Sequence, residues 1–310
     1  MEMPVQLGCF IPQIGPAATP EGMVKAAQSA EKLGFDSVWV TDRLLFPVNP
    51  RNPYVAEPDG KLPDVYKRVF DPIEALTWVA AHTKTIRVGT SVLDIPFYNP
   101  IVLCRSLTSL DVLSGGRLTV GLGLGWSDDE YEATAAHAKH RGVRADEFLQ
   151  VLHAMWKDNP ADFSGKFFTL PKSYFDLRPV QKPHPPIYLA AYAPAAMKRV
   201  ATLADGWMPV GLPVPAITQM WTGIREMAKQ AGRKPGDLKL SVRGNLHLAD
   251  KPAGEGRGMF SGSRDEIKQD VAAVRELKAD ELVIDVTFSP GVKTADDFIK
   301  ANEQARELLG

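Results

Sequence analysis

The chain has 310 residues, of which 45% are hydrophobic and 24% charged, and its formal net charge is −1 with a pI near 6.6. This composition supports a full hydrophobic core in one large or two ordinary domains, and it excludes a disordered chain and a strongly basic nucleic-acid-binding protein. No apolar run approaches the roughly 18–20 residues that span a bilayer, and the first residues lack the pattern of a signal peptide. We therefore expect a cytoplasmic protein without nucleic-acid or membrane partners, whose Cys9 and Cys104 are buried and inert.

The start of the chain has the pattern of a strand, a helix and a second strand. Residues 5–12 form an apolar run that Pro12 ends. Thr19 and Pro20 are typical of an N-cap and a first helical turn, and Gly34 ends the predicted helix. Residues 35–41 predict the second strand, and this order of elements is typical of parallel pairing.

Two long segments lack any clear period. Residues 44–68 contain five prolines and are too long for an ordinary connection between a strand and a helix. A long loop at the carboxyl end of a barrel strand is usually a lid or a wall of the substrate site. Residues 159–186 are also rich in proline, and the run F-S-G-K-F-F-T within them resembles a small hairpin.

The remaining segments continue the alternation of strands and helices. Helices are predicted at residues 72–83, 100–113, 144–157, 194–203, 214–231, 263–277 and 295–309, and strands at residues 86–92, 118–123, 187–191, 207–210, 238–248 and 281–285. Eight strands and about eight helices in alternation predict an α/β fold. We expect a single (β/α)8 TIM barrel over residues 1–310, with insertions after strand 2 and around residues 159–186.

The stretch of residues 113–130, L-S-G-G-R-L-T-V-G-L-G-L-G-W-S-D-D-E, is the best local clue to function. A helix is expected to end at Gly115 and Gly116, and a buried strand then leads into a glycine-rich turn. Ser127 and Glu130 have the spacing of a capping box at the start of the next helix. Glycines that a buried strand delivers to a helix start predict bare backbone, which a flat or phosphorylated ligand can approach.

The pattern S-G-G-R-L-x-x-G-x-G-x-G-W-x-x-x-E resembles the central motif of the luciferase-like monooxygenase superfamily. The resemblance implies a flavin- or deazaflavin-dependent oxidoreductase on a (β/α)8 barrel. The branch that uses coenzyme F-420 (F420), a deazaflavin, is the most similar. These relatives commonly pair as dimers, so we expect a homodimer that acts on a small-molecule substrate.

The same resemblance implies the site residues. Asp42 at the end of strand two would contact the cofactor. Relatives commonly have a histidine next, whereas this chain has Arg43, which cannot act as a general base and points to an anionic substrate or to charge stabilisation. A cis peptide bond between Ser91 and Val92 would support the ring. The cofactor-binding residues implied are Asp42, Thr90, Ser91, Val92, Gly123, Trp126, Asp129, Ala191, Tyr192 and Ala193.

A proton partner is expected for the transfer of a hydride between the substrate and the ring. Glu130 or Asp129 would have this role. The alternative is that Glu130 has only a structural role, as part of a capping box. Two other functions remain open. One is an FMN-dependent monooxygenase of the same fold. Leu124 argues against it, because FMN enzymes often have a phosphate-binding arginine at this position. The other is a non-catalytic barrel that binds a ligand. The six histidines show no metal-binding pattern, so no metal is expected.

Overall fold

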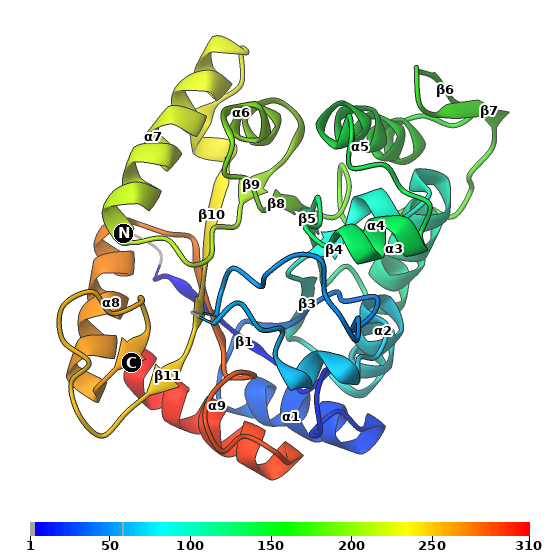
Figure 1. Cartoon of the computed structure of the whole chain (residues 1–310). Helices are drawn as coiled ribbons and strands as arrows, with labels where there is room; N and C mark the ends of the chain where they lie inside the picture. Colours follow the sequence, from blue (N-terminus) through cyan, green and yellow to red (C-terminus); the bar gives the residue numbers. More distant parts are fainter. Residues whose placement is uncertain (1–3, 58) are drawn as a thin grey trace.

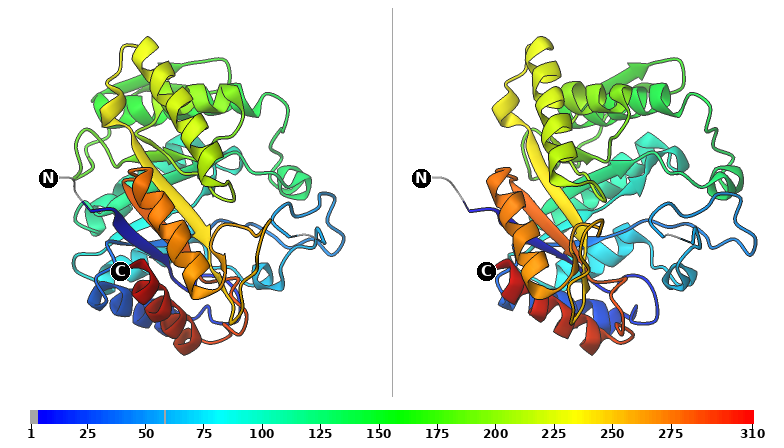
Figure 2. Two further views of the ribbon diagram at one scale, coloured as in Figure 1. Left: turned by 90° about the vertical axis from the view of Figure 1, so that its left-hand side faces the viewer. Right: turned by 60° about the vertical axis from the view of Figure 1, so that its left-hand side comes forward.

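The structure, a computed structural model, describes residues 4–57 and 59–310. Its centre is a closed barrel of eight parallel strands with helices outside it (Figures 1 and 2). The barrel strands are β1 (Gln6–Phe10), β2 (Ser37–Val40), β3 (Arg87–Thr90), β5 (Leu118–Gly123), β8 (Ile187–Leu189), β9 (Gly206–Trp207), β10 (Lys239–Asn245) and β13 (Glu281–Asp285). Pairing of β1 with both β2 and β13, and of β3 with β5, closes the ring. The predicted (β/α)8 barrel is confirmed.

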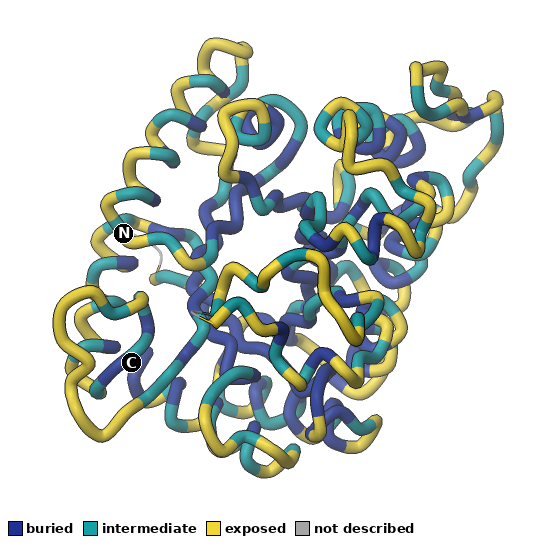
Figure 3. Tube along the Cα trace, viewed as in Figure 1, coloured by how far each residue is buried: buried dark blue, intermediate teal, exposed yellow. Residues whose placement is uncertain are grey.

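The helices surround the barrel. The buried residues are concentrated in the central strands, which are mostly dark blue in Figure 3. They are α1 (Pro20–Lys32), α2 (Pro72–His82), α3 (Pro100–Leu113), α4 (Asp128–Ala133), α5 (Arg141–Lys157), α6 (Pro194–Leu203), α7 (Val214–Gln230), α8 (Arg264–Glu276) and α9 (Ala295–Leu309). Several helix starts follow the sequence signals. Thr19 accepts a hydrogen bond from the amide of Gly22, and Ser263 forms a complete capping box with Glu266.

Most predicted elements are found within a few residues of their expected bounds, with two corrections. The helix expected from residue 144 begins at Arg141 and follows the short helix α4. The strand expected at 238–248 divides after Asn245: its last residues form β11 (His247–Leu248), which pairs with β12 (Ser261–Gly262) outside the barrel. The predicted hairpin is confirmed as β6 (Ala161–Ser164) paired antiparallel with β7 (Thr169–Ser173).

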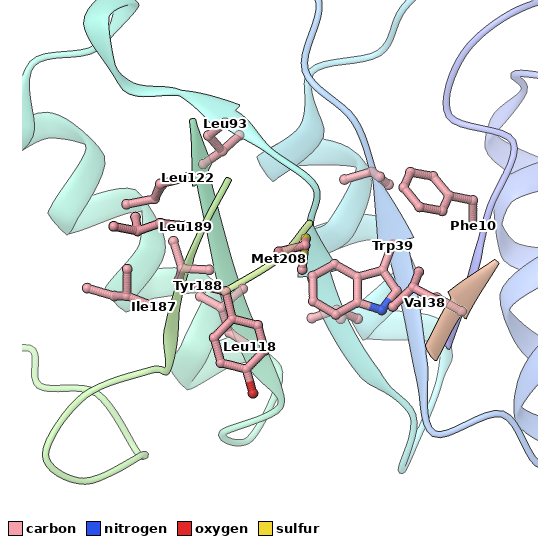
Figure 4. Packing of buried hydrophobic residues seen from close by; sticks show 14 of the residues in the cluster. Phe10, Val38, Trp39, Leu93, Leu118, Leu122, Ile187, Tyr188, Leu189 and Met208 are labelled. Atoms are coloured by element: carbon pink, nitrogen blue, oxygen red, sulfur yellow. The ribbon is translucent and has the colours of Figure 1, made fainter. Parts of the chain in front are cut away.

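Apolar side chains fill the layer beneath the helices, whereas the barrel interior also holds polar side chains, where Ser37 and Ser241 donate hydrogen bonds to Glu281. Trp39 on β2 is fully buried in the interior beside Phe10 (Figure 4). A Cβ atom on Gly89 would lie 2.5 Å from its ring, so the neighbouring strand needs glycine there. The two cysteines, Cys9 and Cys104, are free and buried, as expected.

The third barrel strand contains a bulge. In β3, Gly89 pairs with Thr119, a separation of 30 residues (119 − 89), whereas in β4 (Leu93–Asp94) Leu93 pairs with Leu122, a separation of 29 (122 − 93). The third strand therefore carries one more residue than its neighbour between these pairs. The peptide bond between Ser91 and Val92 lies in the bulge and is cis, as the resemblance implied.

Candidate active site

Two carboxyl groups meet at the carboxyl end of the barrel, where the loops after β2 and β4 approach each other. Asp42 follows β2 and accepts hydrogen bonds from the backbone amide of Asp94 (3.2 Å) and from the hydroxyl of Tyr98 (2.9 Å). Burial raises the pKa of Asp42 to about 6, although these hydrogen bonds lower it. Burial also raises the pKa of Asp94, and the charge of Asp42 raises it further. One of the two carboxyl groups can therefore exchange a proton near neutral pH.

Arg43 and Glu130 form a buried ion pair at the same end of the barrel. The guanidinium Nη1 of Arg43 lies 3.0 Å from Oε2 of Glu130, and the two residues are 8% and 1% exposed. Glu130 also accepts hydrogen bonds from the amides of Leu44 and Leu45. The predicted capping box is wrong at this helix, because Ser127 accepts from the amide of Glu130 but the Glu130 carboxylate binds the loop after β2 instead.

The other acidic side chains of α4 hold the same loop. Asp129 accepts a hydrogen bond from the amide of Arg51 (3.0 Å), and Asp128 accepts one from the side chain of Asn52 (3.1 Å). Arg51 also forms an ion pair with Glu132. We call this set of contacts between α4 and the loop of residues 43–52 the clasp. In Figure 1 the loop after β2 passes beside α4, so the clasp fastens it at the barrel opening.

Aromatic rings form a wall next to the clasp. The rings of Tyr54 and Trp126 lie 5.6 Å apart, and those of Tyr54 and Tyr66 lie 5.8 Å apart. The guanidinium of Arg43 lies 4.9 Å from the ring centre of Trp126. Trp126 is partly buried and packs against this cluster.

The glycines of β5 face the bulge of the third strand. A Cβ atom on Gly121 would lie 1.9 Å from the carbonyl oxygen of Thr90, and one on Gly123 would lie 2.5 Å from Cγ2 of Val92. Thr90 is fully buried, and its hydroxyl both donates to the carbonyl of Gly121 and accepts from its amide, at 2.9 Å each. The absence of side chains on these glycines therefore allows β5 to pack closely against the bulge.

A partly buried arginine on the opposite side of the barrel reaches the bulge. Arg243 on β10 donates from Nη1 to the carbonyl of Ser91 (2.7 Å), and its Nη2 lies 2.6 Å from Oδ2 of Asp285 on β13. Its guanidinium also lies 4.3 Å from the ring centre of Phe10. The Nε atom of Arg243 and the Oδ1 atom of Asn245 are buried and have no hydrogen-bond partner within the residues that the structure describes. One hydrogen-bond donor and one acceptor at the carboxyl end of β10 are therefore unused.

The residues expected to bind a phosphate lie after β8. Ala191 is buried and its carbonyl accepts a hydrogen bond from Trp207, whereas Tyr192 is 45% exposed and its hydroxyl is within hydrogen-bond distance of the backbone of Val210. Ala193 is the N-cap of α6 and offers no side-chain hydrogen bond to the helix. No side chain at Ala193 thus accepts hydrogen bonds from the first amides of α6, which are the groups that an anion at a helix start would contact.

The structure gathers all twelve of the predicted site residues at one end of the barrel, in two groups. Around the loop after β2 lie Asp42, Arg43, Trp126, Asp129 and Glu130. Around β5 and β8 lie Thr90, Ser91, Val92, Gly123, Ala191, Tyr192 and Ala193. Sequence reasoning missed Asp94, Tyr98 and Arg243 as site residues. A charged residue within the otherwise buried strand β10 was the available signal for Arg243.

The family model of luciferase-like monooxygenases matches residues 5–255 of the chain. The chain belongs to this family. It is therefore an enzyme of the oxidoreductase class, and the resemblance read from the central motif is confirmed. Among the described residues, no group of three or more histidine, cysteine or acidic side chains could hold a metal, and no helix is long and apolar enough to span a membrane.

The relatives of this luciferase-like enzyme include both uncharacterized proteins and enzymes named for their cofactor. An uncharacterized protein of Mycobacterium tuberculosis is 33% identical over 204 residues, which cover 63% of this chain and 72% of that protein. An F420-dependent glucose-6-phosphate dehydrogenase of Kineococcus radiotolerans is 28% identical over 240 residues, covering 76% of this chain and 66% of the dehydrogenase.

Solved structures share the fold at lower identity. A monooxygenase from Streptomyces bottropensis, RslO1, superposes with a TM-score of 0.79 at 21% identity over 98% of each chain. An F420-dependent secondary alcohol dehydrogenase, solved with an F420–acetone adduct, has a TM-score of 0.77 at 18% identity, over 99% of this chain and 100% of its own. These likenesses support the barrel fold of the luciferase-like family.

Proposed function

We propose that the protein is an F420-dependent oxidoreductase that transfers a hydride to or from a small organic substrate. The observation that carries the proposal is the partly buried carboxyl of Asp42 beside the Ser91–Val92 bulge, in a chain with F420-dependent dehydrogenases among its relatives. Leu124, within the glycine stretch, further supports a deazaflavin over FMN, because FMN enzymes of this family often have a phosphate-binding arginine at this position.

The residues at the barrel opening fit a ring with a pyrimidine edge. Such an edge carries both N–H donors and carbonyl acceptors, and Asn245 and Arg243 leave one buried acceptor and one buried donor without a partner. Asp42 and the bulge at Ser91 and Val92 would hold the ring. Ala191, Tyr192, Ala193 and the start of α6 would hold a phosphate, while Thr90 and Gly123 shape the wall between these two places. When bound, the deazaflavin supplies the group that accepts or donates the hydride.

Asp42 is our candidate for the proton partner of the hydride transfer. Glu130 and Asp129 were the expected partners, but Glu130 is ion-paired with Arg43 and Asp129 accepts from the amide of Arg51. Asp42, with a pKa of about 6, can take up a proton from a substrate group or return it near neutral pH. We propose that Arg43, Glu130 and Asp129 act by holding the loop after β2, which excludes water from the site.

Cofactor titration tests this proposal. The purified protein should quench the fluorescence of F420 saturably, and FMN should bind more weakly. Asp42→Ala should weaken F420 binding by about tenfold or more, since the loss of a hydrogen bond to a charged group costs roughly 1.5–3 kcal/mol. Glu21→Ala, a change on the first turn of α1, is the control and should leave binding unchanged. Tight FMN binding would favour the monooxygenase alternative, and binding of neither cofactor would favour a non-catalytic barrel.

A further inference from the structure

A second pocket lies just outside the barrel opening, between η2 (Ile95–Phe97), the start of α5 and the β6–β7 hairpin. We call it the basic pocket, and its lining includes Ile95, Tyr98, His137, Arg141, Arg144 and Phe168. Three of these six side chains are basic and none is acidic. The basic pocket therefore offers positive charge against an apolar floor.

The acidic side chains near the basic pocket are engaged elsewhere. Glu132 pairs with Arg51, and Asp146 pairs with Arg199 at 2.6 Å. Glu147 accepts hydrogen bonds from the backbone amides of the hairpin residues Lys166, Phe167 and Phe168. Desolvation raises the pKa of Glu147, but these hydrogen bonds and the charge of Arg144 lower it. Within the part of the chain that the structure describes, no ion pair includes Arg141 or Arg144. Among these residues, neither arginine is thus in direct contact with a carboxylate, although Glu147 partly offsets the charge of Arg144.

The two arginines are held in place by contacts with aromatic side chains. The guanidinium of Arg144 lies 5.2 Å and 5.1 Å from the ring centres of Phe167 and Phe168. Arg141 lies against the hydroxyl of Tyr131, which in turn donates to the carbonyl of Leu124 at the end of β5. Both arginines also lie in the first turn of α5, which has no acidic residue. Positive charge is unfavourable there because the helix dipole is positive at this end, and an anion would relieve this.

The basic pocket is connected to the cofactor site. An adjoining pocket shares Ile95 and Ala145 with it and is lined further by Gly123, Leu124, Ala190 and Ala191. These residues belong to the ends of β5 and β8, where the proposed phosphate position lies. The two pockets therefore meet at Ile95 and Ala145, which places the two arginines on the side of the proposed phosphate position.

We propose that the basic pocket binds the acidic tail of the deazaflavin, with Arg141 and Arg144 as the residues that contact it. This inference rests on the proposed function. The tail joins a phosphodiester to glutamyl carboxylates and is thus a chain of anions, whereas FMN ends at a single phosphate. Arginine suits both groups, since its planar guanidinium can donate two hydrogen bonds to one carboxylate or phosphate.

A comparison of two ligands tests the inference. One is F420 and the other is 8-hydroxy-5-deazariboflavin, which has the same ring without the phosphate and glutamates. The double variant Arg141→Gln/Arg144→Gln should bind F420 about tenfold more weakly than the wild type, as expected for two partly exposed charge pairs, and the tailless ring equally well. The variant Arg141→Lys/Arg144→Lys should recover part of the loss. Arg225→Gln on α7 removes an exposed arginine remote from the pocket and should change neither affinity.

The outcomes separate the two proposals. If the wild type binds neither ligand, the proposed function fails and the inference fails with it. If it binds both and the double variant binds F420 as tightly as the wild type does, the function stands and the inference is overturned. An equal loss for both ligands also overturns it, because the arginines would then support the ring and not the tail. Unchanged melting temperatures would show that the variants are folded.

Discussion

The clasp gives the sharpest test of what Glu130 does. Glu130→Gln keeps the size of the side chain and an acceptor for the amides of Leu44 and Leu45, but it removes the charge that faces Arg43. Arg43 would then remain buried without its anion. Removing one partner of a buried ion pair costs roughly 3–5 kcal/mol, and we expect about 3 kcal/mol because the glutamine can still accept hydrogen bonds.

Limited proteolysis measures this loss where it occurs. Arg51 is exposed in the loop that the clasp holds, so trypsin can cut after it once the loop opens. If cleavage follows local opening, a loss of about 3 kcal/mol raises its rate about 100-fold. Glu132→Gln is the matched control, because the pair of Glu132 and Arg51 is exposed and worth about 1 kcal/mol or less.

Two results would refute this reasoning. Cleavage of Glu130→Gln at the wild-type rate would mean that the buried pair does not hold the loop. Loss of turnover with unchanged cleavage and unchanged affinity for F420 would return Glu130 to a chemical role as proton partner.

The remaining predictions concern the carboxyl pair and the bulge. Because the pKa of Asp42 is raised from 3.8 to about 6, its protonated form stabilises the fold, and that stability is full below pH 3.8 and lost as the pH rises through 6. Asp42→Asn should remove this loss of stability. In urea unfolding at pH 7, the loss amounts to at most about 3 kcal/mol of the free energy of unfolding. Thr90→Val should cost about 1–3 kcal/mol, since it leaves both backbone groups of Gly121 without partners. Gly121→Ala should destabilise strongly and Gly236→Ala, which meets open space, hardly at all.

Each of these predictions has a contrary result. An identical pH dependence of unfolding in the wild type and Asp42→Asn would mean that Asp42 has an ordinary pKa in the folded protein. Equal melting temperatures for Gly121→Ala and Gly236→Ala would mean that the bulge can move away from β5. A Thr90→Val variant as stable as the wild type would show that water satisfies the backbone of Gly121.

Local patterns predicted the fold well because its elements have strong local signals. The helix Pro100–Leu113 and the strand Glu281–Asp285 have the predicted bounds, since a cap, a proline or an unbroken apolar run marks each end. The strand expected at 238–248 was too long because nothing local shows that its final residues leave the barrel for β12.

The site was less predictable because its contacts join residues far apart in the chain. Ser127 and Glu130 have the spacing of a capping box, but Glu130 pairs with Arg43, 87 residues away. Asp42 was identified from its position at the end of the second strand together with the family resemblance. Asp94 was missed as its partner because their approach depends on the extra residue in the third strand, which no local pattern reveals.

That extra residue also decides which way Asp94 faces. Side chains of a strand alternate between its two sides, so in a regular strand residues 88 and 94 would lie on the same side. The added residue reverses the order: Leu93 pairs with Leu122 and lies beside it and Leu189 in the apolar layer, as Figure 4 shows, while Asp94 pairs with Gly123. A shortening of the chain by one residue at this point would exchange the two, with the leucine at the opening and the acid among hydrocarbon. The length of the bulge thus sets which side chain faces the barrel opening.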